Sequence, residues 1–304
     1  FVHGLGAGVA PADGRTEKGG EVLLDPQGKP TGVFIDNAME ALEARLPQPD
    51  LDTLRRDFLQ ALKLCREAGL TGVHDMGMPP RDLEALRALN REGLLTLRTT
   101  VYLYGTSEEL KPYLQQGRIS EGLLTVVGVK LFADGALGSR GAALLEPYTD
   151  RPESRGLILT DLDTLIARVQ EIHHFGYQAA IHAIGDRGVR LALDALMAAP
   201  QTDTHLRHRI EHAQVVAKDD FARFLKLGVI ASMQPTHATS DMPWAEARLG
   251  PLRIQGAYAW RKFLDLKVPL LFGSDAPVED HQPLLGIYAA MTRQDLQGQP
   301  PEGF

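Results

Sequence analysis

Four short apolar segments of this chain each end in a residue that can bind a metal ion. The residues are Lys130, His182, His212 and Asp275, and each is followed within a few positions by Gly, Ala or Pro. Packing alone does not require a polar residue at the end of every apolar run. Metal-dependent hydrolysis needs hard ligands, gathered from distant parts of a chain and fixed around one open site. The pattern therefore predicts a metal-dependent hydrolase.

The two histidines are the strongest part of this pattern. One histidine on an apolar strand is more often a satisfied core residue, but His182 and His212 stand at equivalent places on neighbouring strand–helix units. Neutral imidazoles are good ligands for zinc and similar ions, so the pair favours a metal. Strand alternation predicts that His208, Ile210 and His212 point to one side and Glu211 to the other. We interpret His212 as a ligand and His208 as structural or as a support for the ligands.

Asp275 and Lys130 leave alternatives open. A carboxylate buried at a strand end is costly unless it is paired or metal-bound. Asp275 could instead cap the segment that begins near Pro277. Lys130 could be a Schiff-base nucleophile with a lowered pKa. It could also pair with Asp134, or be carboxylated by CO2 to give an anionic bridging ligand.

Strand and helix patterns alternate through most of the chain, which predicts βαβ units and a parallel sheet. Seven strands can be counted, and a (β/α)8 TIM-type barrel that lacks its first strand fits best. A doubly wound sheet is the alternative, but no Gly-x-Gly-x-x-Gly follows the first strand. The predicted helices span residues 51–68, 81–92, 161–175, 187–198 and 218–227. In a barrel the chemistry lies at the C-terminal ends of the strands, where the four residues fall.

We divide the chain into an entry segment, residues 1–50, and a barrel of strands two to eight, residues 51–304. Turn signals in the entry segment surround a short hairpin predicted near 21–24.

Composition limits the classes of protein to which the chain can belong. Its 304 residues carry a net charge of −7, and 44% are hydrophobic and 23% charged. These values describe a soluble globular protein. The acidity and the lack of a Lys/Arg run argue against a nucleic-acid partner. No apolar run approaches the roughly 20 residues of a membrane helix.

The single cysteine and the mild charge also bear on location and partners. Cys65 is the only cysteine. A reducing, cytoplasmic location fits it. We expect a small-molecule substrate, and a homodimer stays open.

Four motifs in order resemble the amidohydrolase superfamily, and the closest resemblance is to its amidohydrolase-3 branch, which includes N-substituted formamide deformylases. They are residues 129–141, 180–187, 209–214 and 273–278. Residues 32–39, Gly-Val-Phe-Ile-Asp-Asn-Ala-Met, also resemble that branch, so the similarity covers nearly the whole chain.

The resemblance implies roles for the four residues and a cofactor. Lys130 would be an N-carboxylated bridging ligand, His182 and His212 ligands, and Asp275 both a ligand and the proton shuttle. The cofactor would be one or two divalent ions, most often zinc. A metal-bound hydroxide would then attack the carbonyl of an amide or N-formyl group and cleave its C–N bond.

The chain departs from the family pattern in two ways. The family begins its barrel with a His-x-His pair on strand one, and no His-x-His occurs here. The small β-sandwich that family members build from both termini is also absent from the sequence pattern. We therefore expect a fragment that lacks the strand with the pair, and this segment alone could be inactive or bind metal poorly.

Four further residues are candidates for substrate contacts: His74, Asp134, Arg187 and His237. Two other functions stay open. One is a metal-free lyase or aldolase with Lys130 as the Schiff-base residue, and the other is a non-catalytic barrel scaffold in which the polar residues are remnants.

Overall fold

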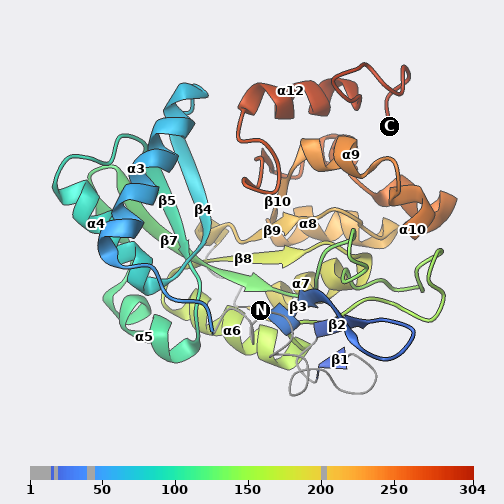
Figure 1. Ribbon diagram of the computed structural model, residues 1–304, viewed down its shortest axis with the longest axis horizontal. Coiled ribbons are helices and arrows are strands. Elements are labelled where there is room, and N and C mark those ends of the chain that lie inside the picture. The colour runs from blue at the N-terminus through green and yellow to red at the C-terminus, as the bar shows by residue number, and fades with distance from the viewer. Residues whose placement is uncertain (1–14, 17–19, 40–44, 200–203) are drawn as a thin grey trace.

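The computed structural model describes residues 15–16, 20–39, 45–199 and 204–304, and within them strands and helices alternate as the sequence predicts (Figure 1). Seven strands form a curled parallel sheet whose order, β4-β5-β7-β8-β9-β10-β11, follows the order of the chain. This is an α/β fold, and each strand runs beside its predecessor. The strands are β4 (Gly72–Met78), β5 (Arg98–Leu103), β7 (Leu124–Phe132), β8 (Gln178–Ala183), β9 (Arg209–His212), β10 (Ile230–Met233) and β11 (Leu270–Phe272).

Helices alternate with the strands along the chain, and several of them cover the outer side of the curled sheet (Figure 1). The first four are α3 (Leu51–Glu67), α4 (Pro80–Arg91), α5 (Ser107–Gln116) and α6 (Leu162–His174). They are followed by α7 (Asp186–Met197), α8 (Phe221–Leu227), α9 (Pro235–Asp241), α10 (Ala245–Arg253), α11 (Trp260–Asp265) and α12 (Pro283–Thr292). Asp50 caps α3 by accepting a hydrogen bond from Thr53 N, and Asp161 caps α6 in the same way through Thr164 N. Such caps satisfy N–H groups that have no partner within the helix.

A second, three-stranded antiparallel sheet comes from the N-terminal part of the chain. It consists of β1 (Arg15–Thr16), β2 (Gly20–Leu24) and β3 (Pro30–Asp36), followed by the 3-10 turn η2 (Asn37–Met39). The pairing of β2 with β3 agrees with the hairpin predicted near 21–24. Residues 1–14 of the predicted entry segment lie outside the described residues.

The core lies between the middle of the sheet and its helices. Every residue of β9 and β10 is buried, as is every residue of β8 except His182. Most residues of the edge strands β4 and β11 are at least partly exposed. In β11, Leu271 is 39% exposed and Phe272 is 48% exposed. Among the described residues each edge strand pairs on one side only, with β5 and β10 respectively. Among the described residues, the curled sheet is thus open between β4 and β11.

The structure adds elements that the sequence pattern does not indicate clearly. They include α5, the short strand β6 (Ile119–Glu121), which runs antiparallel to β7, and α12. Helix α5 begins with a capping box in which Thr106 and Glu109 satisfy each other's backbone N–H groups. None of the helices in the described parts of the chain is long and apolar enough to cross a lipid bilayer.

Candidate functional site

Lys130 lies near the C-terminal end of β7 and is buried, with 6% of its surface exposed. Its Nζ lies 4.5 Å from the centroid of the Phe132 ring. Burial lowers the pKa of this lysine, and the negative charges of Glu211 and Asp275 act in the opposite direction. The side chain is therefore easier to deprotonate than an exposed lysine, as both a Schiff-base nucleophile and an amine that captures CO2 require.

His182 and His212 come together at the ends of neighbouring strands. Their ring centroids are 4.6 Å apart. Burial lowers the pKa of His182 to about 3 and that of His212 well below its usual range, so both rings are neutral at physiological pH. His182 Nε2 lies 3.3 Å from the carbonyl oxygen of Gly135, and His212 Nδ1 lies 2.8 Å from Gln234 Oε1. Each ring thus donates from one nitrogen to a protein acceptor and keeps a lone pair on the other, the form that binds metals.

The alternation predicted for β9 is wrong at His212. Ile210 packs in the core and His208 contacts His173 of α6, as helix-facing residues should. His212 and Ala213, however, have positive φ values of 72° and 41°, so the strand geometry ends there and the His212 ring meets His182 instead. Positive φ is uncommon for residues other than Gly and gathers at functional sites. The two-residue alternation of side chains along a strand cannot predict this change of backbone direction at His212.

His237 and Asp275 are the next two candidate residues near this pair. His237 stacks on His212, with ring centroids 5.9 Å apart and planes 16° apart, and its Nε2 is buried without a hydrogen-bond partner among the described residues. Asp275 follows β11, has a positive φ of 59°, and stands on the exposed edge of the sheet. Partial burial of its carboxyl raises the pKa, and its neighbours His237 and Lys130 act in the opposite direction.

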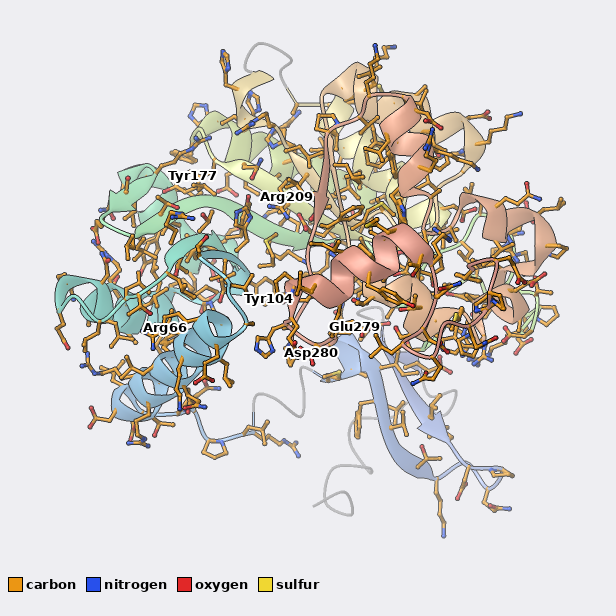
Figure 2. The ribbon with its side chains drawn as sticks, turned by 90° about the horizontal axis from the view of Figure 1, so that it is seen from above. Arg66, Tyr104, Tyr177, Arg209, Glu279 and Asp280 are labelled. Carbon is orange, nitrogen blue, oxygen red and sulfur yellow. The ribbon has the colours of Figure 1, made fainter. Side chains whose placement is uncertain are left out.

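An aromatic wall adjoins the same residues. The Phe132 ring lies 5.3 Å from the His182 ring and 5.5 Å from the Tyr104 ring. Phe132 and Tyr104 meet edge to face, a favoured arrangement of aromatic rings. Tyr104 follows β5 and is 45% exposed (Figure 2). The site therefore combines neutral imidazoles and a buried lysine with an apolar surface.

Arg209 and Glu211 of β9 form a buried ion pair, and Arg209 is labelled in Figure 2. Arg209 donates to both carboxylate oxygens of Glu211, at 2.7 and 2.8 Å, and also to Ser232 Oγ and Tyr102 OH. His74 Nδ1 lies 2.9 Å from Arg209 Nη1, so in this structure His74 contacts the ion pair. As a substrate contact His74 stays a prediction.

Asp134 is fully buried, and its carboxyl accepts hydrogen bonds from the backbone N–H groups of Ala143, Ile184 and Gly185 at 2.8, 2.9 and 2.8 Å. These bonds join the loops that follow β7 and β8. The carboxyl lies 3.8 Å from His182 Nε2, and burial raises its pKa to about 7. The Asp134 carboxyl, which the sequence analysis considered as a partner of Lys130 or a contact for substrate, is therefore hydrogen-bonded to backbone amides in this structure. Arg187 is exposed on α7, and its role stays a prediction.

Asp36 brings the N-terminal hairpin to the same loop. A Cβ atom added at Gly135 or Gly141 would lie 2.2 or 2.1 Å from Asp36 Oδ2, so the loop can pass this carboxyl only because both residues are glycines. Asp36 has a positive φ of 51°, and its Oδ2 is buried without a hydrogen-bond partner among the described residues. Burial raises the pKa of this carboxyl to about 6. Asp36 belongs to the motif at 32–39, which sequence reasoning left without a role.

The two imidazoles fit a metal ion, but they do not complete a site. Within the described residues no three His, Cys, Asp or Glu side chains converge closely enough to chelate an ion. Lys130 could add an oxygen ligand only after carboxylation, and Asp275 lies on the open edge. Only two of the four predicted ligands are therefore oriented for metal binding. His182 and His212 are each oriented by a hydrogen bond to a protein acceptor. Among the described residues, Lys130 and Asp275 have no such arrangement.

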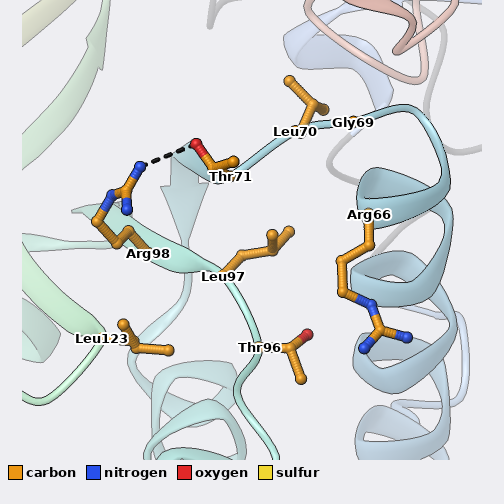
Figure 3. Close-up of a pocket in the computed structure, with 8 residues that line it drawn as sticks. All are labelled: Arg66, Gly69, Leu70, Thr71, Thr96, Leu97, Arg98 and Leu123. Atoms are coloured by element: carbon orange, nitrogen blue, oxygen red, sulfur yellow. Dashed lines mark hydrogen bonds between the residues drawn. The ribbon is translucent and has the colours of Figure 1, made fainter.

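A cavity of about 440 Å³ is lined by residues that include Thr71, Arg98 and Leu123 (Figure 3). Thr71 precedes β4, Arg98 begins β5 and Leu123 precedes β7, so these lining residues mark the N-terminal ends of the strands. Arg98 donates to Thr71 Oγ1 at 2.9 Å. In barrel enzymes this end serves stability and the other end carries the chemistry.

Comparison with known proteins defines the class. Residues 3–303 match the amidohydrolase family. A putative amidohydrolase of Bacillus subtilis, YtcJ, is 32% identical over 290 residues, which are 92% of this chain and 54% of that protein. N-substituted formamide deformylase of Arthrobacter pascens is 25% identical over 93% of this chain and 54% of its own length. The crystal structure of an uncharacterized metal-dependent hydrolase from Pyrococcus horikoshii superposes with a TM-score of 0.76 at 31% identity, covering 92% of this chain and 55% of that one.

This chain therefore belongs to the amidohydrolase family, in its amidohydrolase-3 branch. It spans about half the length of the relatives that it matches.

The sequence pattern did not single out Gln234, the Arg209–Glu211 pair or Asp36 as site residues. Gln234 carried a usable signal, because it directly follows an apolar strand, as the predicted ligands do. Asp36 carried none, since its partners are two glycines in a distant part of the chain.

Proposed function

We propose that this chain is the central part of a hydrolase that uses a divalent metal to cleave a C–N bond in an amide or N-formyl group. The observation that carries the proposal is the meeting of His182 and His212, each with one ring nitrogen engaged by a protein acceptor. Membership of the amidohydrolase family and the likeness to a metal-dependent hydrolase support it. The N-formyl group is suggested by the formamide deformylase among its relatives.

The metal would be held by His182 through Nδ1, by His212 through Nε2, by Asp275 and by an N-carboxylated Lys130. Carboxylation needs a neutral amine, and the burial of Lys130 favours that form. Neutral imidazoles together with oxygen ligands suit zinc, as one ion or two. When bound, the metal would supply a Lewis acid that activates water and polarises the scissile carbonyl.

The side chains of the chain would handle substrate and proton. Asp275 would accept the proton of the attacking water and deliver it to the leaving nitrogen. His237, whose buried Nε2 has no partner among the described residues, would hold the carbonyl oxygen as negative charge develops on it. The wall of Phe132 and Tyr104 would pack against the apolar part of a small-molecule substrate.

In the same proposal the curled sheet is a (β/α)8 barrel without its first strand. A further strand between β4 and β11 would close the sheet, because each of these strands pairs on one side only among the described residues. In the family that strand carries the His-x-His pair, which would add two ligands. This segment would then bind metal more weakly than a chain that includes the pair.

The test is the metal content of the purified protein, prepared with bicarbonate present and compared with Lys130→Ala and His182→Ala. We expect near-stoichiometric zinc or a similar ion, lost in both variants. The matched control is His174→Ala, an exposed histidine at the end of α6, which should leave the metal content unchanged. Retention of the metal by both site variants would contradict the proposal, and so would a lack of metal even after an N-terminal strand with His-x-His is restored. A positive result justifies a screen of N-acyl and N-formyl substrates.

One specific observation favours a second candidate function, a Schiff-base lyase. Lys130 is buried beside an aromatic ring and its pKa is lowered, as a Schiff-base lysine requires. Borohydride reduction in the presence of a carbonyl substrate would trap a covalent adduct at Lys130 if this candidate is correct. The converging histidines have no role in it.

A further inference from the structure

Gln234 occupies the position between β10 and α9, directly behind the His212 ring. It is buried, with 8% exposure, and its Oε1 lies 2.8 Å from His212 Nδ1. Its amide nitrogen lies 3.4 Å from the carbonyl oxygen of Ser232, which can only accept a hydrogen bond. The amide is therefore oriented with its nitrogen toward Ser232 and its oxygen toward the imidazole.

This orientation decides which nitrogen of His212 carries the hydrogen. An amide oxygen only accepts, so its hydrogen bond with the imidazole requires the hydrogen on Nδ1. A neutral imidazole with its hydrogen on Nδ1 has its lone pair on Nε2. The His212 ring also contacts two other imidazoles, with ring centroids 4.6 Å from His182 and 5.9 Å from His237.

We propose that Gln234 is the positioning residue that fixes the tautomer and the orientation of His212, so that Nε2 is the nitrogen presented to a metal ion. This role rests on the proposed metal-dependent function, and Gln234 acts only through His212. Partners of this kind behind a metal-binding histidine typically contribute about 10- to 100-fold to metal affinity.

Two substitutions of Gln234 distinguish orientation of His212 through a hydrogen bond from packing alone. Gln234→Met keeps a side chain of similar length but removes the acceptor, whereas Gln234→Glu keeps an acceptor oxygen. We expect Gln234→Met to raise the Kd for Zn²⁺ or Co²⁺, measured by competition with a chelator, by about 10- to 100-fold. Gln234→Glu should restore most of the affinity. The Co²⁺ absorption spectrum should change in Gln234→Met, because the ring no longer has a fixed direction.

The matched control is Gln214→Met. Gln214 is also buried, but it donates to Tyr258 OH and Asp241 Oδ2, each at 3.0 Å, and not to His212. We expect this variant to lose stability while its metal Kd and Co²⁺ spectrum stay those of the unmodified protein. Equal losses of affinity in Gln214→Met and Gln234→Met would mean that both glutamines only pack, and would overturn the inference.

A second measurement works without metal and keeps the inference separate from the proposed function. Nitrogen NMR of histidine-labelled protein reports the tautomer of each ring, and the His212 signals are assigned by their loss in His212→Gln. We expect hydrogen on Nδ1 in the unmodified protein and in Gln234→Glu, and a mixture of tautomers in Gln234→Met. Hydrogen on Nε2 in the unmodified protein would overturn the inference. If the expected tautomers are seen in a protein that binds no metal even after a His-x-His strand is restored, the positioning by Gln234 is upheld and the proposed metal function is rejected.

Discussion

Strands β8 and β9 and strands β4 and β11 belong to one sheet, yet they hold their side chains in different surroundings. The two interior strands are buried almost throughout, and they carry His182 and His212, each with one ring nitrogen held by a protein acceptor. The two edge strands are only partly buried; β4 contains His74, and β11 precedes Asp275. Burial on both faces therefore fixes half of the candidate site in advance. The surroundings of Asp275 and His74 depend instead on what packs against the edge strands β11 and β4.

The largest effect should come from breaking the ion pair inside the sheet. Arg209→Met leaves the Glu211 carboxylate buried without its partner, and we expect a loss of about 3–5 kcal/mol in the free energy of unfolding. The measurement is urea unfolding followed by circular dichroism. The matched control is Arg261→Met, which removes an exposed ion pair with Asp265 and should cost about 1 kcal/mol or less. Similar losses of unfolding free energy in the two variants would mean that water reaches the Arg209–Glu211 ion pair inside the sheet.

Truncation of apolar side chains should show a smaller but clear contrast between interior and edge. Ile181 of β8 is fully buried, so Ile181→Ala should cost about 2–5 kcal/mol. Leu271 of β11 is 39% exposed. Leu271→Ala should cost about 1 kcal/mol or less, because much of that side chain is already in water. Urea unfolding of both variants under one set of conditions gives the comparison, and a large loss at Leu271 would show that this edge is covered in solution.

The smallest effect is a pH dependence at the edge strand β4. Burial raises the pKa of Asp75 to about 6, above its ordinary value of 3.8, so between these values the folded state binds more protons than the unfolded state. Its contribution to stability is therefore present below about pH 4 and is lost as the pH rises to about 6. Relative to the unmodified protein, Asp75→Asn should gain stability from about pH 4 to about pH 6.5, measured by urea unfolding at each pH. A constant difference between the two proteins across this range would contradict the raised pKa.

The sequence predicted most of the fold because hydrophobic periods and cap signals are local. The helices at 51–68 and 161–175 and the strands that end near His182 and His212 agree with α3, α6, β8 and β9 to within a few residues. Strands β4 and β11 each pair on one side only among the described residues, which agrees with the expectation of a missing strand.

The site was less predictable because its decisive features are not local. Placing the predicted ligands at strand ends required only the pattern of apolar runs. The turn of His212 toward His182 depends on a positive φ, and the pairing of Gln234 with His212 joins two strands. The fate of Asp134 depends on three backbone amides in two loops, which no spacing of residue types reveals.

The position of Asp36 between two glycines has a consequence for movement. Its carboxyl lies against Gly135 and Gly141, and the Gly135 carbonyl in turn holds the ring of His182. The hairpin and the loop after β7 are therefore in direct steric contact, so a displacement of the loop large enough to admit a substrate must also displace the end of β3. The N-terminal hairpin, which supplies none of the proposed ligands, is thus coupled by contact to the loop beside His182, and amide hydrogen exchange in the two segments should rise and fall together.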